Sequence, residues 1–382
     1  MRSNYRSVYI AFDQFPSFKG AATHITQMVS QLQTDFPDTL LLTLPGKTIE
    51  SVQGSYDHFP IKVEETNFLK RASLFSHEVN NILSNQYNMI FGHFRDIWGG
   101  MAVLNHKHII PVFEVNGLPS IELPYRYPSI SRDTLKKVEA LEQTCLLKSE
   151  LIICPSQTIR KYLEQRGVQA EKIEVVTNGA DIPIKNPQAE NLPENYMIYF
   201  GALQPWQGVD VLIKSLTYLR DKEDFYLVIC SSHKEKFARP LKKLAEKLDV
   251  SSRIIWKDQL EKNELNVMIQ HARFSVAPLI ECSRNLKQGC SPLKIFESLA
   301  NGTPVIASDL PVVREIVVSD VEAKLFRAGR PADLAKCIRI LLDNPDFLET
   351  LSTNGIEKIR VQFTWEKIRQ RMSGIYEKLL VY

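Results

Sequence analysis

The chain has 382 residues, more than a single hydrophobic core normally organises, so we expect two domains. Its composition, 44% hydrophobic and 24% charged, is that of a soluble globular protein. The formal net charge of +3 is small and the basic residues are scattered, which excludes a dedicated nucleic-acid-binding protein, because such a protein concentrates basic residues in a stripe. No nucleic acid is therefore expected among the partners.

The six cysteines show neither a CxxC pair nor a metal-ligand spacing, and some lie in apolar runs such as LIIC. They are predicted to be reduced thiols in the core of a cytoplasmic protein. Asp13 follows only five apolar residues, too few for a signal peptide, and no apolar run reaches the length of about 18 residues that a membrane span needs. The expected location is the cytoplasm, and a peripheral contact with the inner face of a membrane stays open.

Short apolar runs alternate with amphipathic segments, which is typical of parallel sheets with crossover helices. In the first half of the chain, strands are predicted at 7–12, 39–44, 89–94, 109–115, 151–154 and 173–176. Helices are predicted from about Ala22, at 131–148 and at 156–166.

The stretch 181–194 holds three prolines and few large apolar residues, which predicts a linker between two domains. A second alternating set follows, with strands at 196–201, 225–230, 253–256, 274–279 and 304–307 and helices at 208–220, 239–248 and 261–271. The predicted division is an N-terminal domain at 1–182, a linker at 183–194, a C-terminal domain at 195–362 and a closing helix at 363–382. We expect two doubly wound α/β domains that hold a ligand in the cleft between them.

The segment GCSPLKIFESLANGTPVIASD (289–309) predicts a helix, with Ser291 as the N-cap and Pro292 at the first helical position. Lys294 stands where a capping box would carry Glu or Gln. A cation in the first turn opposes the helix dipole at a cost of roughly 0.3–1 kcal/mol, unless an anion sits at the helix N-terminus. A phosphate site with Lys294 is one reading, and a lysine bent into solvent is the alternative.

Glu297 follows one turn later and is a candidate acceptor of hydrogen bonds from the sugar hydroxyls of a nucleotide. The alternative is an exposed helix carboxylate, the commoner fate of glutamate. Arg284 and Lys287 lie in the preceding loop, where solvated side chains are expected for both.

The run SPLKIFESLANGTPVIASD resembles the family 4 glycosyltransferases, as do VVTNGAD (175–181), GALQPWQGVDVLI (201–213), SFKGAATHI after the first strand, and the closing FTWEKI…IYEKLL. The resemblance covers nearly the whole chain. It implies the GT-B fold, two Rossmann-like domains facing a central cleft, with the closing helix crossing back to the N-terminal domain. It also implies transfer of a sugar from a nucleotide-diphosphate donor with retention of anomeric configuration.

The resemblance assigns donor-binding roles to residues of both halves. Glu297 matches the second of two glutamates that flank the donor and would bind the ribose, whereas the first is replaced by Gly289. The arginine and lysine that usually grip the diphosphate are replaced by Ala202 and Gln207, which leaves Lys294 as the nearest suitable cation and a predicted catalytic residue. The remaining predicted donor-binding residues are Ser291, Leu293 and, in a loop that approaches the donor phosphates or the acceptor, Gly20.

In the N-terminal half, His93 resembles the histidine that contacts the transferred sugar, which makes it the other predicted catalytic residue, and a structural histidine is the alternative. The segment 113–128 is rich in polar and aromatic residues after a strand, which predicts either an acceptor site or an ordinary structured loop. The predicted acceptor-binding residues are Arg95, Glu114, Asn116 and Glu122.

The predicted function is a retaining glycosyltransferase whose C-terminal domain binds the donor and whose N-terminal domain binds a glycan or lipid-linked acceptor. The sequence has no DxD motif and no evident nucleophile, so neither metal nor cofactor is expected, and stabilisation of the leaving diphosphate would carry the reaction. Two alternatives stay open. One is another sugar-nucleotide enzyme of the same fold, such as an epimerase. The other is a catalytically silent binding subunit, which the replacements at Gly289, Ala202 and Gln207 favour.

Overall fold

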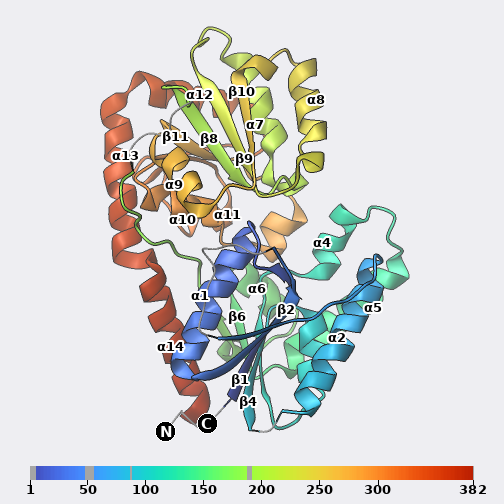
Figure 1. Ribbon diagram of the computed structural model, residues 1–382. Coiled ribbons are helices and arrows are strands. Elements are labelled where there is room, and N and C mark those ends of the chain that lie inside the picture. The colour runs from blue at the N-terminus through green and yellow to red at the C-terminus, as the bar shows by residue number, and fades with distance from the viewer. Residues whose placement is uncertain (1–5, 48–55, 87, 187–191, 382) are drawn as a thin grey trace.

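The structure is a computed structural model that describes residues 6–47, 56–86, 88–186 and 192–381. It confirms the predicted GT-B architecture of two α/β domains, each built on a twisted parallel sheet covered by helices on both faces (Figure 1). The predicted linker lies partly outside the described residues, at 187–191. Among the described residues, no helix is long and apolar enough to cross a membrane.

The N-terminal sheet has the strand order β3-β2-β1-β4-β5-β6-β7. Its strands are β1 (Arg6–Phe15), β2 (Asp38–Pro45), β3 (Asp57–Pro60), β4 (Met89–Phe94), β5 (Ile110–Glu114), β6 (Leu151–Cys154) and β7 (Ile173–Val175). The helices around it are α1 (Gly20–Asp35), α2 (Phe68–Ser84), α3 (Ile97–Val103), α4 (Pro119–Arg126), α5 (Arg132–Lys148) and α6 (Gln157–Gln165).

The C-terminal sheet has the order β10-β9-β8-β11-β12-β13. Its strands are β8 (Tyr196–Gly201), β9 (Tyr226–Ser231), β10 (Ile254–Asp258), β11 (Phe274–Ala277), β12 (Val305–Ser308) and β13 (Ala323–Phe326). Its helices are α7 (Val209–Ser215), α8 (Arg239–Lys247), α9 (Lys262–Gln270), α10 (Leu293–Ala300), α11 (Pro311–Arg314), α12 (Pro331–Asp343) and α13 (Pro345–Lys358). Two short π-helical turns, η6 (Arg284–Gln288) and η7 (Ile359–Phe363), precede α10 and the closing helix α14 (Trp365–Val381).

The central strand β1 shows why apolar runs form this sheet. Val8 and Ile10 belong to one buried cluster, and Tyr9 and Ala11 belong to another on the opposite face. All four side chains are fully buried, because helices cover the sheet on each side. A strand buried on both faces needs a continuous apolar run rather than alternation, and the sequence prediction of this strand relied on such a run.

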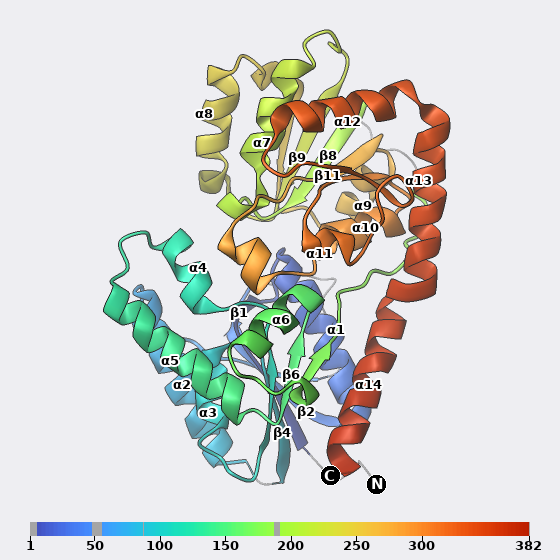
Figure 2. The ribbon, with the colours of Figure 1, turned by 180° about the vertical axis from the view of Figure 1, so that it is seen from behind.

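Helix α14 starts beside the C-terminal domain and runs along the N-terminal domain, where it packs on α1 (Figures 1 and 2). The predicted apolar positions Ile368, Met372 and Ile375 are buried in a cluster that also contains residues of α1 and β1. At its start, the backbone N–H of Ala180 donates to the carbonyl of Phe363 at 2.9 Å, so the chain connects the two domains twice at this point.

The sequence reading missed several elements, of which α4 bears on the site. The segment 113–128, read as a loop, contains this helix, and Pro119 stands in its first turn, where proline is tolerated. Also missed were β3, α2, α3, α11, β13, α12 and α13.

Candidate functional site

A cavity of about 400 Å³ lies between the two domains. The N-terminal domain contributes the loop after β1 and the first turns of α1. The C-terminal domain contributes the ends of β8 and β9 and the start of α10. This is the place where parallel α/β sheets bind ligands, beyond the carboxyl ends of their strands. The predicted donor-binding residues all line it: Gly20, Ser291, Leu293, Lys294 and Glu297.

Two helix N-termini enter this cavity, one from each domain. Helix α1 begins at Gly20 after Lys19, and α10 begins at Leu293 after Pro292. No side chain caps either helix. The first N–H groups of a helix lack partners within the helix and carry a partial positive charge, so two uncapped ends in one cavity favour an anion.

The predicted N-cap role of Ser291 is wrong. Pro292 takes the N-cap position instead of the first helical one, and the Ser291 hydroxyl accepts a hydrogen bond from the backbone N–H of Asn178 at 2.9 Å. Ser291 is thereby held by the N-terminal domain, and the start of α10 keeps its N–H groups for a ligand. The sequence predicts Ser291 as a residue of the site. It could not predict this hydrogen bond, because Asn178 lies 113 positions away in the chain.

The two domains meet closely at this point. A Cβ atom added to Gly20 would lie 2.8 Å from Cδ1 of Leu293, which is closer than real Cβ contacts. The start of α1 at Gly20 thus lies against the flexible end of the Leu293 side chain at the start of α10. This close approach places both helix ends around the same ligand volume.

Lys294 faces the cavity rather than the solvent, so the alternative of a solvated lysine is wrong. Its Nζ donates a hydrogen bond to Oε1 of Gln207 at 2.6 Å and lies 4.1 Å from the centre of the Tyr199 ring. Burial lowers the pKa of Lys294 to about 7, because it disfavours the ammonium form, and the nearby Cys290 and Glu297 oppose that shift only in part. Such a lysine gains its full charge when an anion binds beside it.

Glu297 also lines the cavity and is only partly exposed. Burial raises the pKa of its carboxyl, while the positive charges of Lys262 and Lys294 oppose that shift. Glu297 is therefore not an ordinary exposed carboxylate, and its contact with ligand hydroxyls stays a prediction.

The expectation of a solvated Arg284 is wrong. Its side chain is 14% exposed, forms an ion pair with Glu122 at 3.3 Å, and stacks over the Trp206 ring at 5.5 Å. It lines the cavity from the turn η6, and no sequence signal distinguished it from Lys287, which is exposed as predicted. Arg284 is thus a cation of the site that sequence reasoning missed.

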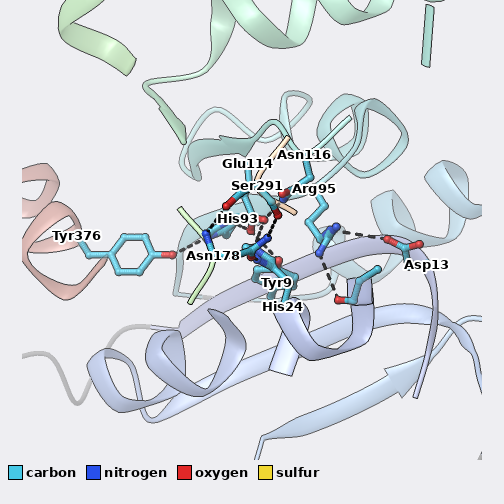
Figure 3. Close-up of polar contacts among 11 residues, drawn as sticks. Tyr9, Asp13, His24, His93, Arg95, Glu114, Asn116, Asn178, Ser291 and Tyr376 are labelled. Atoms are coloured by element: carbon cyan, nitrogen blue, oxygen red, sulfur yellow. Dashed lines mark hydrogen bonds and ion pairs between the residues drawn. The ribbon is translucent and has the colours of Figure 1, made fainter. Parts of the chain in front are cut away.

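His93 does not line the cavity, and its predicted contact with a transferred sugar stays a prediction. The side chain is fully buried, with Nε2 2.8 Å from Oε2 of Glu114 and Nδ1 2.6 Å from the hydroxyl of Tyr376 (Figure 3). Tyr376 belongs to α14, so this helix covers His93 near the end of β4. These contacts favour the structural alternative for His93.

None of the four predicted acceptor-binding residues lines this cavity, and their predicted role stays a prediction. Glu114 is buried and accepts hydrogen bonds from Tyr9 and from the amide of Asn116. Arg95 is paired with Asp13 at 3.7 Å. Glu122 lies on α4 and binds Arg284 and Gln288 of the C-terminal domain, so it joins the domains.

Comparison with known families covers the chain in two adjoining parts. Residues 18–182 match the model described as Glycosyltransferase Family 4, and residues 182–358 match the model described as Glycosyl transferases group 1. The boundary between the two matches falls in the segment that connects β7 and β8.

Two relatives are similar in sequence. The MMP alpha-(1->4)-mannosyltransferase of Mycolicibacterium hassiacum is 26% identical over 232 residues, which cover 60% of this chain and 54% of that protein. This chain thus spans about half the length of that mannosyltransferase. The D-inositol 3-phosphate glycosyltransferase of Corynebacterium glutamicum is 24% identical over 318 residues, which cover 76% of this chain and 72% of that protein.

Solved structures share the fold at low identity. Sucrose-phosphate synthase from Thermosynechococcus elongatus superposes with a TM-score of 0.80 at 17% identity, covering 98% of this chain and 99% of that one. HepE of Anabaena in complex with UDP-glucose gives a TM-score of 0.76 at 15% identity, covering 98% and 99% of the two chains.

Proposed function

Because the chain belongs to the family 4 glycosyltransferases, we propose that it transfers a sugar from a nucleotide-diphosphate donor to a glycan or lipid-linked acceptor, with retention of configuration at the anomeric carbon. One observation carries this proposal: the uncapped N-termini of α1 and α10 meet in one cavity that also holds the side chain of Lys294. HepE, which has this fold, is described with UDP-glucose bound.

The cavity suits a diphosphate by its charge. Helix N–H groups donate to phosphate oxygens, and Lys294 and Arg284 add positive charge from the C-terminal domain. Glu297 would accept hydrogen bonds from the hydroxyls of the nucleotide sugar. In this arrangement the donor lies mainly against the C-terminal domain, and its phosphates reach the start of α1.

The chemistry would depend on the leaving group. When the bond between the anomeric carbon and the diphosphate breaks, negative charge grows on the phosphate oxygen that leaves. Fixed N–H groups and the Lys294 ammonium stabilise that charge more than they stabilise the bound substrate, which lowers the barrier. On the face that the diphosphate leaves, the acceptor oxygen forms the new bond to the anomeric carbon, and its proton passes to the departing phosphate oxygen. We propose no metal or cofactor for this step.

A two-stage experiment tests the proposal. Thermal unfolding is first measured with UDP, GDP, ADP and CDP, because a ligand at 100 times its Kd adds about 2.7 kcal/mol of stability. The matching nucleotide sugars are then offered with glycan and lipid-linked acceptors, and the anomeric configuration of the product is read by proton NMR. An inverted product would refute retention, and stabilisation by none of the nucleotides would refute a nucleotide donor.

The same experiment separates the remaining alternatives. An altered sugar nucleotide that forms without any acceptor would identify an epimerase. Nucleotide binding with no transfer to any acceptor would identify a silent binding subunit. We favour an active enzyme over that subunit, because Lys294 places its ammonium group beside Gln207, where the resemblance implies that a phosphate-binding cation has been lost.

A further inference from the structure

A chain of buried hydrogen bonds joins the core of the N-terminal domain to the residue that precedes α10 (Figure 3). It runs from Glu114 through His24 and Asn178 to Ser291. All of these residues are less than a tenth exposed. Asn178 lies before the linker and Ser291 lies in the C-terminal domain, so the chain crosses between the domains at the edge of the cavity.

The orientation of the Asn178 side chain follows from its partner. One side of the amide is 2.6 Å from the backbone carbonyl oxygen of Ser291, which can only accept a hydrogen bond. The amide nitrogen must therefore face that carbonyl. The amide oxygen Oδ1 is then the atom that faces His24.

His24 consequently lies between two acceptors. Its Nδ1 is 2.6 Å from Oδ1 of Asn178, and its Nε2 is 2.5 Å from Oε1 of Glu114. A neutral imidazole has one N–H and one acceptor nitrogen, so it could satisfy only one of these contacts. With a proton on each ring nitrogen, the His24 imidazolium satisfies both.

Glu114 is the carboxylate that balances this charge. Its oxygens also accept from the Tyr9 hydroxyl at 2.7 Å and from Nε2 of His93 at 2.8 Å. Burial would raise the pKa of Glu114, but the charge and hydrogen bond of His24, with those of His93 and Arg95, hold it well below its ordinary value. Glu114 is therefore a carboxylate whose oxygen faces Nε2 of His24 as an acceptor.

His93 provides a contrast within the same network. Its Nε2 also donates to Glu114, but its Nδ1 faces the Tyr376 hydroxyl, which can donate. A neutral His93 satisfies both contacts. The two histidines on Glu114 are thus expected to differ in charge, and only His24 connects to the donor site.

We propose that His24 is a positioning residue of the donor site, which as an imidazolium orients Asn178 and through it holds Ser291 at the entrance to α10. Asn178 binds Ser291 twice, because its backbone N–H also donates to the serine hydroxyl. Ser291 directly precedes Pro292, the N-cap of α10, and Leu293, its first residue. The position of Ser291 therefore determines where the uncapped N-terminus of α10 lies. The inference rests on the proposed function, since it assigns a role in donor binding.

The first test is independent of activity. NMR of the 15N-histidine-labelled protein at pH 7 reads the protonation of each ring nitrogen in the eight histidines. We expect an imidazole with both nitrogens protonated, and we expect its signals to disappear in His24→Gln and its Nδ1 signal to shift in Asn178→Ala. A neutral tautomer at His24 would overturn the proposal.

The second test measures nucleotide affinity by calorimetry, with UDP, GDP, ADP and CDP as probes. Asn178→Ala is expected to raise the Kd of the bound nucleotide about tenfold, the loss expected for one hydrogen bond to a charged group. Asn178→Ala keeps the His24–Glu114 pair. The variant therefore still tests the positioning role if His24→Gln does not fold. Tyr376→Phe is the matched control, because it removes a hydrogen bond at the opposite end of the network and should change the Kd less than about twofold.

The outcomes separate the two proposals. Wild-type protein that binds none of these nucleotides would refute the proposed function and with it the donor role of His24. Wild-type protein that binds, with Asn178→Ala binding equally well, would refute the positioning role alone. An equal loss of affinity in Tyr376→Phe would show that general destabilisation of the network causes the effect, which would also overturn the proposal.

Discussion

Lys294 is the residue whose replacement tests the site most directly. Its pKa falls from an ordinary value of 10.5 to about 7, because burial disfavours the ammonium form. The unfolded chain therefore binds more protons than the folded chain between about pH 7 and pH 10.5, and stability rises with pH across that window. At neutral pH the lysine destabilises the empty protein, and the penalty disappears as the pH approaches 10.5.

The variant Lys294→Met keeps the length of the side chain without its charge. At 1.36 kcal/mol per pKa unit, the lowered pKa of Lys294 corresponds to a destabilisation of the folded protein of at most roughly 4–5 kcal/mol at neutral pH. Loss of the contacts with Gln207 and the Tyr199 ring offsets part of the gain. We therefore expect the free energy of unfolding at pH 7 to rise, on the order of 1–3 kcal/mol.

Activity should change in the opposite direction. The variant loses a charge-assisted contact to the donor phosphates worth roughly 1.5–3 kcal/mol, which corresponds to a 10- to 100-fold lower kcat/KM at low donor concentration. Urea unfolding at pH 7 and pH 9.5 gives the stability, and initial rates give the activity. Lys287→Met, at an exposed position just before α10, is the control and should change stability by no more than about 0.5 kcal/mol. A Lys294→Met protein that is less stable than wild type yet fully active would refute this reasoning.

Three further predictions concern the same cavity. Glu297→Gln should weaken nucleotide binding by roughly 1–2 kcal/mol, because an amide accepts hydrogen bonds from hydroxyls less strongly than a carboxylate; calorimetry giving equal affinities would remove Glu297 from the site. Nucleotide binding at pH 8 should take up a proton, because Lys294 has a pKa of about 7 in the free protein and an adjacent phosphate raises it; binding heats that do not depend on the ionisation enthalpy of the buffer would contradict this. Glu122→Ala should loosen the contact between the domains at Arg284 and raise the radius of gyration in solution scattering, and saturating nucleotide should lower it again; identical dimensions in all states would argue against a hinge.

The sequence by itself determined the architecture. Strands buried on both faces need continuous apolar runs, and the runs at 89–94, 151–154 and 196–201 coincide with β4, β6 and β8. The order of these runs, alternating with helices, specifies two parallel sheets. The donor-site residues from Ser291 to Glu297 were also within reach, because a lysine at a helix start is a local anomaly that an anion would explain and because the surrounding motif resembles a known family.

Tertiary structure decided which polar residues face the cavity. His93 and Glu114 end or nearly end neighbouring strands, where a ligand site is expected, yet Tyr376 of α14 covers His93 from 283 positions away. Arg284 and Lys287 are alike in sequence, but the turn η6 directs only Arg284 into the site. A strand or helix pattern fixes which way a side chain points relative to its own element. Long-range packing determines which partner that side chain meets, whether a ligand, a buried carboxylate or the other domain. For His24, the two acceptors that packing places beside its ring are also the basis of its proposed charge.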